Sequence, residues 1–386
     1  MNKYIEPHKE WIDSTWKKID DKLKVVAPRT MGLHPYSSID GKHVPVYKTN
    51  RETGEKTIDY TWWTNGFWGG LLWLMYLDTK NELYKDCAID QEDLLDKAYE
   101  NIDGLHHDVG FMWHLTSGAN YRITGSQKSR TRNLLAAAFL AARYNIKGNF
   151  IRAWGPIDNE GLTIIDTMMN IHLLYWAYRE KKDKNYLYVA NAHADMAMRD
   201  HVRPDGSVIH MVKHNPETGE VIETLGGQGY EDGSSWARGQ GWALYGFTLA
   251  HIHSGNTEYL DTAKKIAHYV ISCICEDDYR VRVDLRAPED PVIIDSTAAG
   301  LIACGLIEIA KLAGEHEKKI YINAAIKILK SIDKYCCNYD ENEDALVLKG
   351  SHSYHRLEQR EIPIVYGDFY YVEAMSKLRG NEFLIW

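Results

Sequence analysis

The sequence lacks several features that would assign a protein to a class at once. It contains no run of about 18 apolar residues, so we expect no membrane-spanning helix, and no apolar segment typical of a secretion signal follows its first residue. Its six cysteines form no C-x-x-C pair, which indicates reduced thiols in a cytoplasmic protein. Basic runs are also missing, and the net charge is −9. We therefore expect neither nucleic acid nor a membrane as a partner.

Nucleotide-binding motifs are missing too. There is no P-loop and no Gly-x-Gly-x-x-Gly turn, so phosphate and nicotinamide chemistry are unsupported. The run His106-His107-Asp108 offers metal ligands, but no further His/Asp pair stands at ligand spacing, and we expect no metal site. Phenylalanine is scarce, with seven residues, whereas 12 Trp and 25 Tyr are present. Aromatic rings with a polar edge suit carbohydrate, because the ring face covers C–H groups while the edge binds hydroxyls.

Two kinds of helical pattern alternate along the chain. Amphipathic segments are predicted over residues 4–25, 90–103, 126–145, 184–201, 256–275 and 316–337. Segments that are apolar on nearly every side, as in buried helices, begin near Asn65, Asp108, Asp166, Trp236, Asp295 and Asp368. Six outer and six inner helices predict an all-α fold, an (α/α)₆ barrel in which residues 1–386 form a single domain.

The inner helices of such a barrel run parallel, so their polar starts gather at one end and form the expected pocket. Turn residues beside short alternating runs over 203–213 and 221–222 predict a β-hairpin in a loop at that end.

Two aspartates at this end carry the main functional hypothesis. Asp166 lies near the start of a buried helix that we expect from Gly161 to about Glu180, where a carboxylate can simply cap the helix. Asp108 begins the neighbouring inner helix, however, and two carboxylates facing one cleft are the minimum for acid–base work on sugars. Burial and crowding would raise one pKa, so that this group carries a proton near neutral pH. We therefore favour catalysis over capping.

A Gly- and Trp-rich run over residues 226–242 opens a further inner helix. Trp236 and Trp242 alternate with glycines and would form a wide, rigid wall. Arg238 would project a planar guanidinium group suited to a carboxylate. The alternative is that Arg238 pairs with a structural acid.

These segments resemble the unsaturated glucuronyl hydrolases, glycoside hydrolase family eighty-eight. The matching stretches are 63–68, 107–111, 165–170, 228–230, 236–240 and 366–370, in order along nearly the whole chain. The resemblance implies an enzyme without metal or organic cofactor, which acts in the cytoplasm on a small oligosaccharide left by a polysaccharide lyase. The non-reducing sugar of that substrate is a Δ4,5-unsaturated uronic acid.

The resemblance also implies roles for individual residues. Asp166 would protonate C4 and activate water for attack at C5, after which the hemiketal opens and the second sugar leaves. Asp108 would hold the ring hydroxyls and shape the field around Asp166. The implied substrate-binding set is Trp63, His107, Trp154, His210, Gln228, Trp236, Arg238, Trp242, Ser353 and Arg356.

One stretch departs from the family. Some members carry a Ser-x-x-Ser-x-Lys run near the C-terminus that receives a sulfate on the second sugar. Here Ser353 matches the first serine, but Arg356 and Glu358 stand at the other two positions. We therefore expect no strong preference for sulfated substrates.

Two alternatives stay open at this point. The sister unsaturated rhamnogalacturonyl hydrolases share the fold and chemistry but act on pectin fragments. A non-catalytic sugar-binding barrel would need the aromatic wall but not both aspartates. The runs over 107–111 and 235–240 favour the glucuronyl group. The sequence does not determine the second sugar, its linkage and sulfation, or the oligomeric state.

Overall fold

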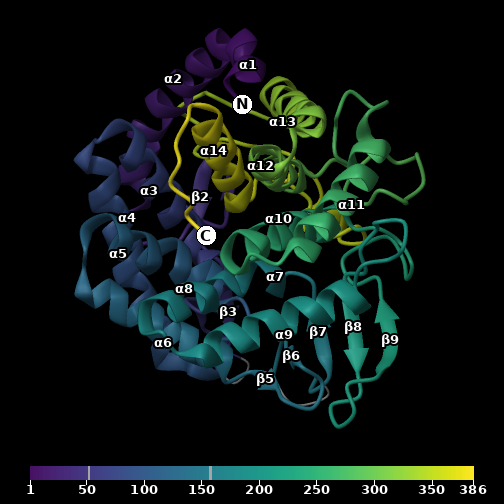
Figure 1. Ribbon diagram of the computed structural model, residues 1–386. Coiled ribbons are helices and arrows are strands. Elements are labelled where there is room, and N and C mark those ends of the chain that lie inside the picture. The colour runs from purple at the N-terminus through teal and green to yellow at the C-terminus, as the bar shows by residue number, and fades with distance from the viewer. Residues whose placement is uncertain (51–52, 156–158) are drawn as a thin grey trace.

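A ring of inner helices forms the centre of the molecule (Figure 1). The computed structural model describes residues 1–50, 53–155 and 159–386. In this part of the chain each inner helix contacts the next one around the ring, and the last contacts the first. The inner helices are α3 (Phe67–Thr79), the π-helix η5 (Gly110–Gly118) continued by α5 (Ala119–Thr124), α7 (Thr167–Asn170) continued by α8 (His172–Lys181), α10 (Ala237–Ser254), α12 (Ser296–Leu312) and α14 (Val365–Leu378).

An outer helix packs against each inner one. The outer helices are α2 (Lys9–Val26), α4 (Glu82–Leu94), α6 (Gln127–Ala141), α9 (Lys184–Asp200), α11 (Thr257–Ile274) and α13 (Glu315–Tyr335). Shorter helices are α1 (Asn2–Ile5), η1 (Glu6–His8), η2 (Ala27–Thr30), η3 (Trp63–Gly66), η4 (Leu95–Gly104) and η6 (Leu357–Gln359). The predicted (α/α)₆ barrel is confirmed.

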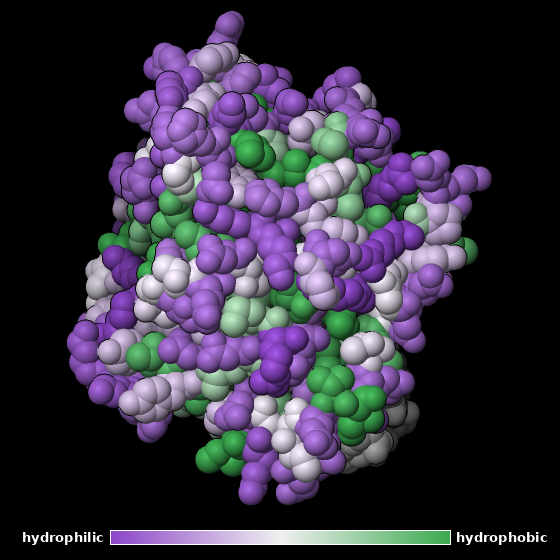
Figure 2. Space-filling view, turned by 45° about the vertical axis from the view of Figure 1, so that its right-hand side comes forward, coloured by the Kyte–Doolittle hydropathy of each residue, from purple (hydrophilic) through white to green (hydrophobic). Residues whose placement is uncertain are grey.

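The two rings differ in burial as their sequences predict. In the inner helix α12 every residue from Ser296 to Ala310 is buried, whereas the outer helix α11 buries only one face. Because a helix that is apolar all round must be enclosed, the inner helices form the core. Hydrophilic side chains cover most of the face in Figure 2, with hydrophobic groups in separate patches between them. Within the described residues, no helix is both long and apolar enough to cross a bilayer.

Four inner helices connect to their outer partners by the same tight turn. The inner helix ends at a residue with positive φ, and the next residue caps the outer helix by accepting a hydrogen bond from its first turn. Left-handed C-caps followed directly by Asn, Ser or Asp caps satisfy free groups of both helices in two residues. The pairs are Lys80-Asn81, Gly125-Ser126, Lys182-Asp183 and Gly255-Asn256.

The longer connections carry the strands. These are β1 (Ser37–Ile39), β2 (Lys42–Val44), β3 (Tyr47–Thr49), β4 (Lys56–Ile58), β5 (Tyr144–Asn145), β6 (Phe150–Ile151), β7 (Leu162–Ile164), β8 (Met211–His214) and β9 (Val221–Leu225). The order β7-β8-β9 forms an antiparallel sheet. The predicted hairpin is confirmed for β8 and β9, but residues 203–209 contribute only the isolated bridge between Val202 and Val208.

Three predicted boundaries are wrong. The helix expected over 90–103 begins at Glu82, because Asn81 caps it, and helical backbone breaks at Asn101. Residues 162–164 form strand β7 rather than helix, since the β-branched Thr163 and Ile164 pair with β8. Asp368 lies inside the first turn of α14 instead of preceding it.

The tight turns make a stability prediction. Asn256→Ala removes the side chain that caps α11 and should lower the free energy of unfolding by about 1 kcal/mol. Thermal unfolding followed by circular dichroism measures the change. The control is Asp261→Ala, an exposed position in the same helix, which should leave the melting temperature nearly unchanged. Equal melting temperatures for wild type and Asn256→Ala would contradict the role of the cap.

Candidate active site

A cleft of about 440 Å³ opens at the end of the barrel where inner helices begin. Its walls come from segments that precede α3, η5, α7, α10 and α14, together with the β7-β8 edge. The lining residues are Trp62, Trp63, His106, His107, Asp108, Trp154, Ile164, Asp166, His210, Met211, Gly227, Gln228, His352 and Arg356. The gathering of helix starts at one pocket is therefore what the sequence predicted.

Asp166 stands directly before α7, in the position of a capping residue. Its side chain makes no capping hydrogen bond, and its Oδ1 atom is buried without a hydrogen-bond partner. His210 Nε2 is 3.7 Å from this oxygen, too far for a hydrogen bond. Burial, and next the charge of Asp108, raise the pKa of Asp166 to about 8. Asp166 therefore keeps its proton at neutral pH, and the capping interpretation does not fit the geometry.

Asp108 has the opposite surroundings. Its Oδ1 accepts a hydrogen bond from Asn170 Nδ2 at 3.0 Å, and its Oδ2 lies 3.3 Å from His106 Nδ1 and 3.5 Å from His107 Nε2. Burial alone would raise the pKa of Asp108, but His107, His106 and Asn170 outweigh it, and the pKa is lowered. Asp108 is thus ionised at neutral pH. The cleft holds one protonated and one charged carboxyl group, which is the arrangement needed for a proton donor with an anionic neighbour.

Two buried histidines complete the floor of the cleft. Burial lowers the pKa of His107 and of His210 to about 3, so both rings are neutral at neutral pH. His210 Nδ1 accepts a hydrogen bond from the backbone N–H of Gln228 at 3.0 Å. The main-chain oxygen of Gly226 lies 3.4 Å from the same nitrogen. Because the Gln228 contact is the shorter one, we assign the proton of the neutral ring to Nε2, which faces Asp166. Trp236 packs against the His210 ring, with 4.2 Å between centroids, and holds its orientation.

Six of the ten predicted substrate-binding residues line the cleft. The Trp154 side chain is 39% exposed, and Arg356 forms no ion pair or side-chain hydrogen bond with the described residues, so both are available to a ligand. The six are Trp63, His107, Trp154, His210, Gln228 and Arg356.

The other four lie behind the cleft wall. Trp242 is 0% exposed and packs against the Phe111 ring, while Trp236 is 2% exposed behind His210. The sequence suggested an open wall, but α10 is buried on all sides from Ala237 to Ala250, so its aromatic rings face other helices. Ser353 is also buried and absent from the lining.

Arg238 does not project into the cleft as expected. Its guanidinium group is 1% exposed, and Nη1 donates to Asp295 Oδ2 at 2.8 Å. Nη1 and Nη2 also donate to the main-chain oxygens of Ser351 and His352, each at 2.7 Å. The structural acid that the sequence left as an alternative is therefore Asp295. Arg238 clamps the segment that carries His352 and Arg356.

Several lining residues were missed by the sequence reasoning. Trp62 directly precedes Trp63, and the Trp-Trp run was a usable signal. His106 was considered only as a metal ligand. His352 reaches the cleft because Arg238 binds its main-chain oxygen and Asp295 binds the N–H of the preceding Ser351, and no local pattern in the sequence indicates this.

The donor atoms of His106, His107 and Asp108 lie within 4.8 Å of one another, as in a metal site. Protein partners already occupy part of this set, because His107 Nδ1 lies 2.6 Å from Thr167 Oγ1 and Asp108 Oδ1 binds Asn170. That no metal binds here stays a prediction.

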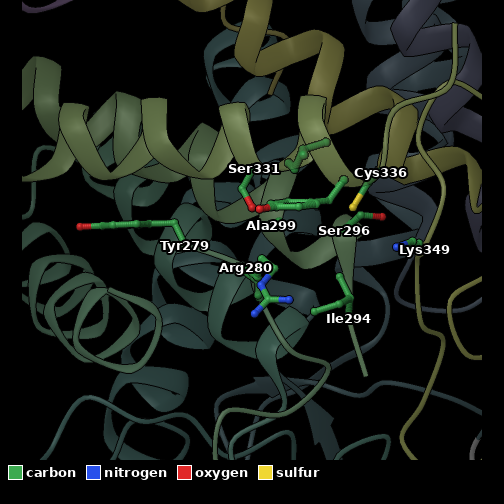
Figure 3. A pocket seen from close by; sticks show the side chains of 11 residues that line it. Tyr279, Arg280, Ile294, Ser296, Ala299, Ser331, Cys336 and Lys349 are labelled. Atoms are coloured by element: carbon green, nitrogen blue, oxygen red, sulfur yellow. The ribbon is translucent and has the colours of Figure 1, made fainter. Parts of the chain in front are cut away.

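A second, smaller cavity of about 70 Å³ lies beside α12 and α13 and shares no lining residue with the cleft. Figure 3 shows Ser296, Ala299 and Cys336 close together, while Tyr279 points away from them. The described residues that line this cavity include no carboxyl group. This cavity therefore does not offer the pair of carboxyl groups that lines the cleft.

Comparison with known proteins agrees with this geometry. No family model matches the chain. An unsaturated glucuronyl hydrolase from Bacillus sp. strain GL1 is 36% identical over 339 residues, which cover 85% of this chain and 89% of that protein. An unsaturated chondroitin disaccharide hydrolase from Streptococcus pneumoniae is 32% identical, with 85% of each chain covered. The chain belongs to the unsaturated glucuronyl hydrolase family.

A solved unsaturated glucuronyl hydrolase from Streptococcus agalactiae has the same fold. It superposes with a TM-score of 0.86 at 29% identity, covering 97% of this chain and 93% of that one. A variant of the Streptococcus agalactiae enzyme, solved in complex with dGlcA-GalNAc6S, superposes with a TM-score of 0.80 at 28% identity over the same shares. Our chain is therefore a hydrolase of this family, with the (α/α)₆ architecture throughout.

The raised pKa of Asp166 predicts how the stability of this unsaturated glucuronyl hydrolase depends on pH. The folded protein holds the Asp166 proton up to about pH 8, whereas the unfolded chain releases it near pH 4. Stability due to this group is thus present at low pH and lost as pH rises between these values. Asn does not titrate, so Asp166→Asn does not lose stability in this way as pH rises. The melting temperature of the variant minus that of wild type should therefore be larger at about pH 9 than at about pH 5, by about 2 °C or more.

Differential scanning calorimetry at both pH values checks this expectation. The exposed Asp261→Asn serves as the matched control and should show the same difference from wild type at both. A pH-independent difference for Asp166→Asn would mean that the Asp166 carboxyl is not held in its protonated form.

Proposed function

We propose that this chain hydrolyses oligosaccharides whose non-reducing end is a Δ4,5-unsaturated glucuronic acid, products of lyases acting on glycosaminoglycans or similar polyuronides. Family membership supports this substrate class, since relatives are named for unsaturated glucuronyl and chondroitin disaccharide hydrolysis. The observation that carries the proposal is a buried, protonated Asp166 that faces the cleft beside an ionised Asp108.

The proposed reaction is hydration of a vinyl ether. Asp166 transfers its proton to C4, and the positive charge that develops at C5 is shared with the ring oxygen. The carboxylate left on Asp166 then takes a proton from water while the water oxygen bonds to C5, so Asp166 ends in its starting form. The resulting hemiketal opens and releases the second sugar. The negative charge of Asp108 stabilises the developing cation, and its oxygens accept hydrogen bonds from ring hydroxyls.

Aromatic and polar groups of the cleft are proposed to bind the sugars. Trp63 and Trp154 offer ring faces for the C–H surfaces of the pyranoses. His210 and Gln228 offer polar atoms on the opposite wall, and Arg356 offers an unpaired cation to an anionic group. We further propose that residues 1–386 act as one catalytic domain in the cytoplasm, which the six free cysteines support.

The direct test follows the conjugated double bond. Purified protein is mixed with lyase products of chondroitin, hyaluronan, heparin, gellan and rhamnogalacturonan, and the ultraviolet absorbance of the unsaturated sugar is recorded. We expect absorbance to fall with one or more glucuronyl substrates, because hydration consumes the double bond. Activity confined to the pectin-derived product would transfer the chain to the rhamnogalacturonyl group. Binding without loss of absorbance on any substrate would contradict catalysis.

Asp166→Asn should abolish most of the activity while leaving the fold intact. Loss of the proton donor should lower kcat by at least about 10²-fold, whereas KM should change much less, because binding groups remain. Asp108→Asn should also be severe, since it removes the anionic neighbour. The control is Asp368→Asn, another buried aspartate, which binds backbone N–H groups away from the cleft. Near-native turnover by folded Asp166→Asn protein would refute the assigned donor.

The C-terminal loop makes a prediction about sulfate. Arg356 lines the cleft and can bind a sulfate, whereas the exposed Glu358 close by repels it. Exposed charge pairs contribute about 1 kcal/mol or less, so we expect kcat/KM for matched sulfated and unsulfated chondroitin disaccharides to differ by less than about tenfold. Glu358→Lys should shift the ratio towards the sulfated substrate, and Arg356→Ala should shift it away. A hundredfold preference of the wild-type protein for the sulfated substrate would contradict the proposed roles of Arg356 and Glu358.

A further inference from the structure

Asn170 hydrogen-bonds both aspartates, although it does not itself line the cleft and is not exposed to solvent. It lies at the end of α7, one turn after Asp166, and is 0% exposed. Its Nδ2 donates to Asp108 Oδ1 at 3.0 Å and to the main-chain oxygen of Asp166 at 3.3 Å. Its Oδ1 accepts a hydrogen bond from the backbone N–H of Phe111 at 2.9 Å. The Nδ2 and Oδ1 atoms of Asn170 thus all have hydrogen-bond partners, and these bonds link the start of η5 to α7.

The packing leaves Asn170 little freedom. A Cβ atom at Gly110 would lie 2.7 Å from both the Cα and the Oδ1 of Asn170, so only glycine permits this approach of η5 to α7. The amide is thus held in one orientation by three hydrogen bonds and by the neighbouring backbone. A side chain fixed in this way can place a carboxylate within fractions of an ångström.

The two oxygens of Asp108 have different partners. Among the described residues, Asn170 is the side chain that donates to Oδ1, while Oδ2 faces two histidines. The charged or titratable groups that surround the aspartate pair from the packed elements are His106, His107, His210, Arg143, Arg238, Tyr366 and Tyr370. His107 and then His106 lower the pKa of Asp108 most, and the hydrogen bond from Asn170 lowers it further. Of these three groups, Asn170 makes the shortest contact with the carboxylate, at 3.0 Å.

We propose that Asn170 is a positioning residue, which fixes the Asp108 carboxylate against Asp166 and keeps it ionised during the reaction. The inference rests on the proposed function, in which Asp108 acts as an anion and Asp166 as the proton donor. Asn170 takes no part in bond making. It acts through Asp108, by donating a hydrogen bond that the protonated form of Asp108 would use less well.

The consequence appears in one limb of the pH profile. In the proposed reaction, kcat/KM rises with pH as Asp108 ionises and falls again as Asp166 loses its proton. Loss of the Asn170 donor should move the acid limb to higher pH by about one unit, the equivalent of one hydrogen bond to a charged group. The alkaline limb should stay in place, because Asp108 is fully ionised in that range in either protein.

The test compares Asn170→Ala with Asn133→Ala in the full-length protein. Asn133 is equally buried and contacts the same inner segment through His114, but it touches neither aspartate. The pH dependence of kcat/KM on an unsaturated disaccharide should show a shifted acid limb for Asn170→Ala and an unshifted one for Asn133→Ala. Equal acid limbs in all three proteins would overturn the proposal, as would equal shifts in both variants.

A second variant covers the case in which Asn170→Ala does not fold. A measurement without substrate covers the case in which the protein is inactive. Asn170→Asp keeps the shape and the acceptor for Phe111 but replaces the donor, so its acid limb should move at least as far. Titration of the Asp108 carboxyl by ¹³C NMR in Asp-labelled protein, assigned with Asp108→Asn, should show the same rise of its pKa. An unshifted Asp108 titration overturns the inference. A shifted titration in a protein that hydrates no unsaturated sugar would instead refute the proposed function and leave the Asn170–Asp108 link standing.

Discussion

Burial of two neighbouring carboxyl groups in one cleft is the constraint on which the rest of the site depends. Burial disfavours the charged form of Asp166, and the charge of Asp108 disfavours it further, so Asp166 stays protonated at neutral pH while Asp108 is ionised. The two carboxyl groups have unequal surroundings. Asp108 Oδ1 accepts a hydrogen bond from Asn170 and its Oδ2 lies beside His106 and His107, whereas Asp166 Oδ1 is buried without a hydrogen-bond partner. A buried polar group without a hydrogen-bond partner lowers the stability of the fold. The hydrophobic packing of the inner helices must therefore offset the cost of burying Asp166.

The two ends of the barrel differ in how the inner and outer helices are connected. At the far end, inner helices turn into outer helices through a left-handed residue and a capping residue, such as Gly255 and Asn256, and backbone groups there are paired. At the cleft end, the connections are longer and carry strands and exposed rings. Local unfolding or loop motion at the cleft therefore need not disturb the turns that hold the ring together.

The sequence predicted features that depend on local patterns, such as the positions of the helices. It did not predict features that depend on tertiary contacts, such as the direction in which a side chain points. Apolar periodicity located the helices, and polar helix starts located Asp108 and Asp166, because a parallel ring must bring those starts together. Trp242 and Arg238 were misplaced, since a Gly-rich helix start reads alike whether it faces a cleft or other helices. His352 was missed for a related reason: a partner more than a hundred residues away holds its backbone. The boundary at Asn81 was readable as a capping signal and was overlooked.

Arg238 anchors the loop that carries His352 and Arg356. It fixes the main chain at Ser351 and His352 through a buried pair with Asp295, while Trp236 and Tyr366 cover its guanidinium plane. Beyond this anchor, Arg356 lines the cleft and forms no ion pair with any residue that the structure describes. The aspartates sit on helix starts that cannot move without opening the core. Gln228 also holds this loop, since its side chain donates to the main-chain oxygen of His352 and its main-chain oxygen accepts from the N–H of Tyr354. The loop that carries Arg356 is therefore anchored separately from the helix starts that carry Asp108 and Asp166.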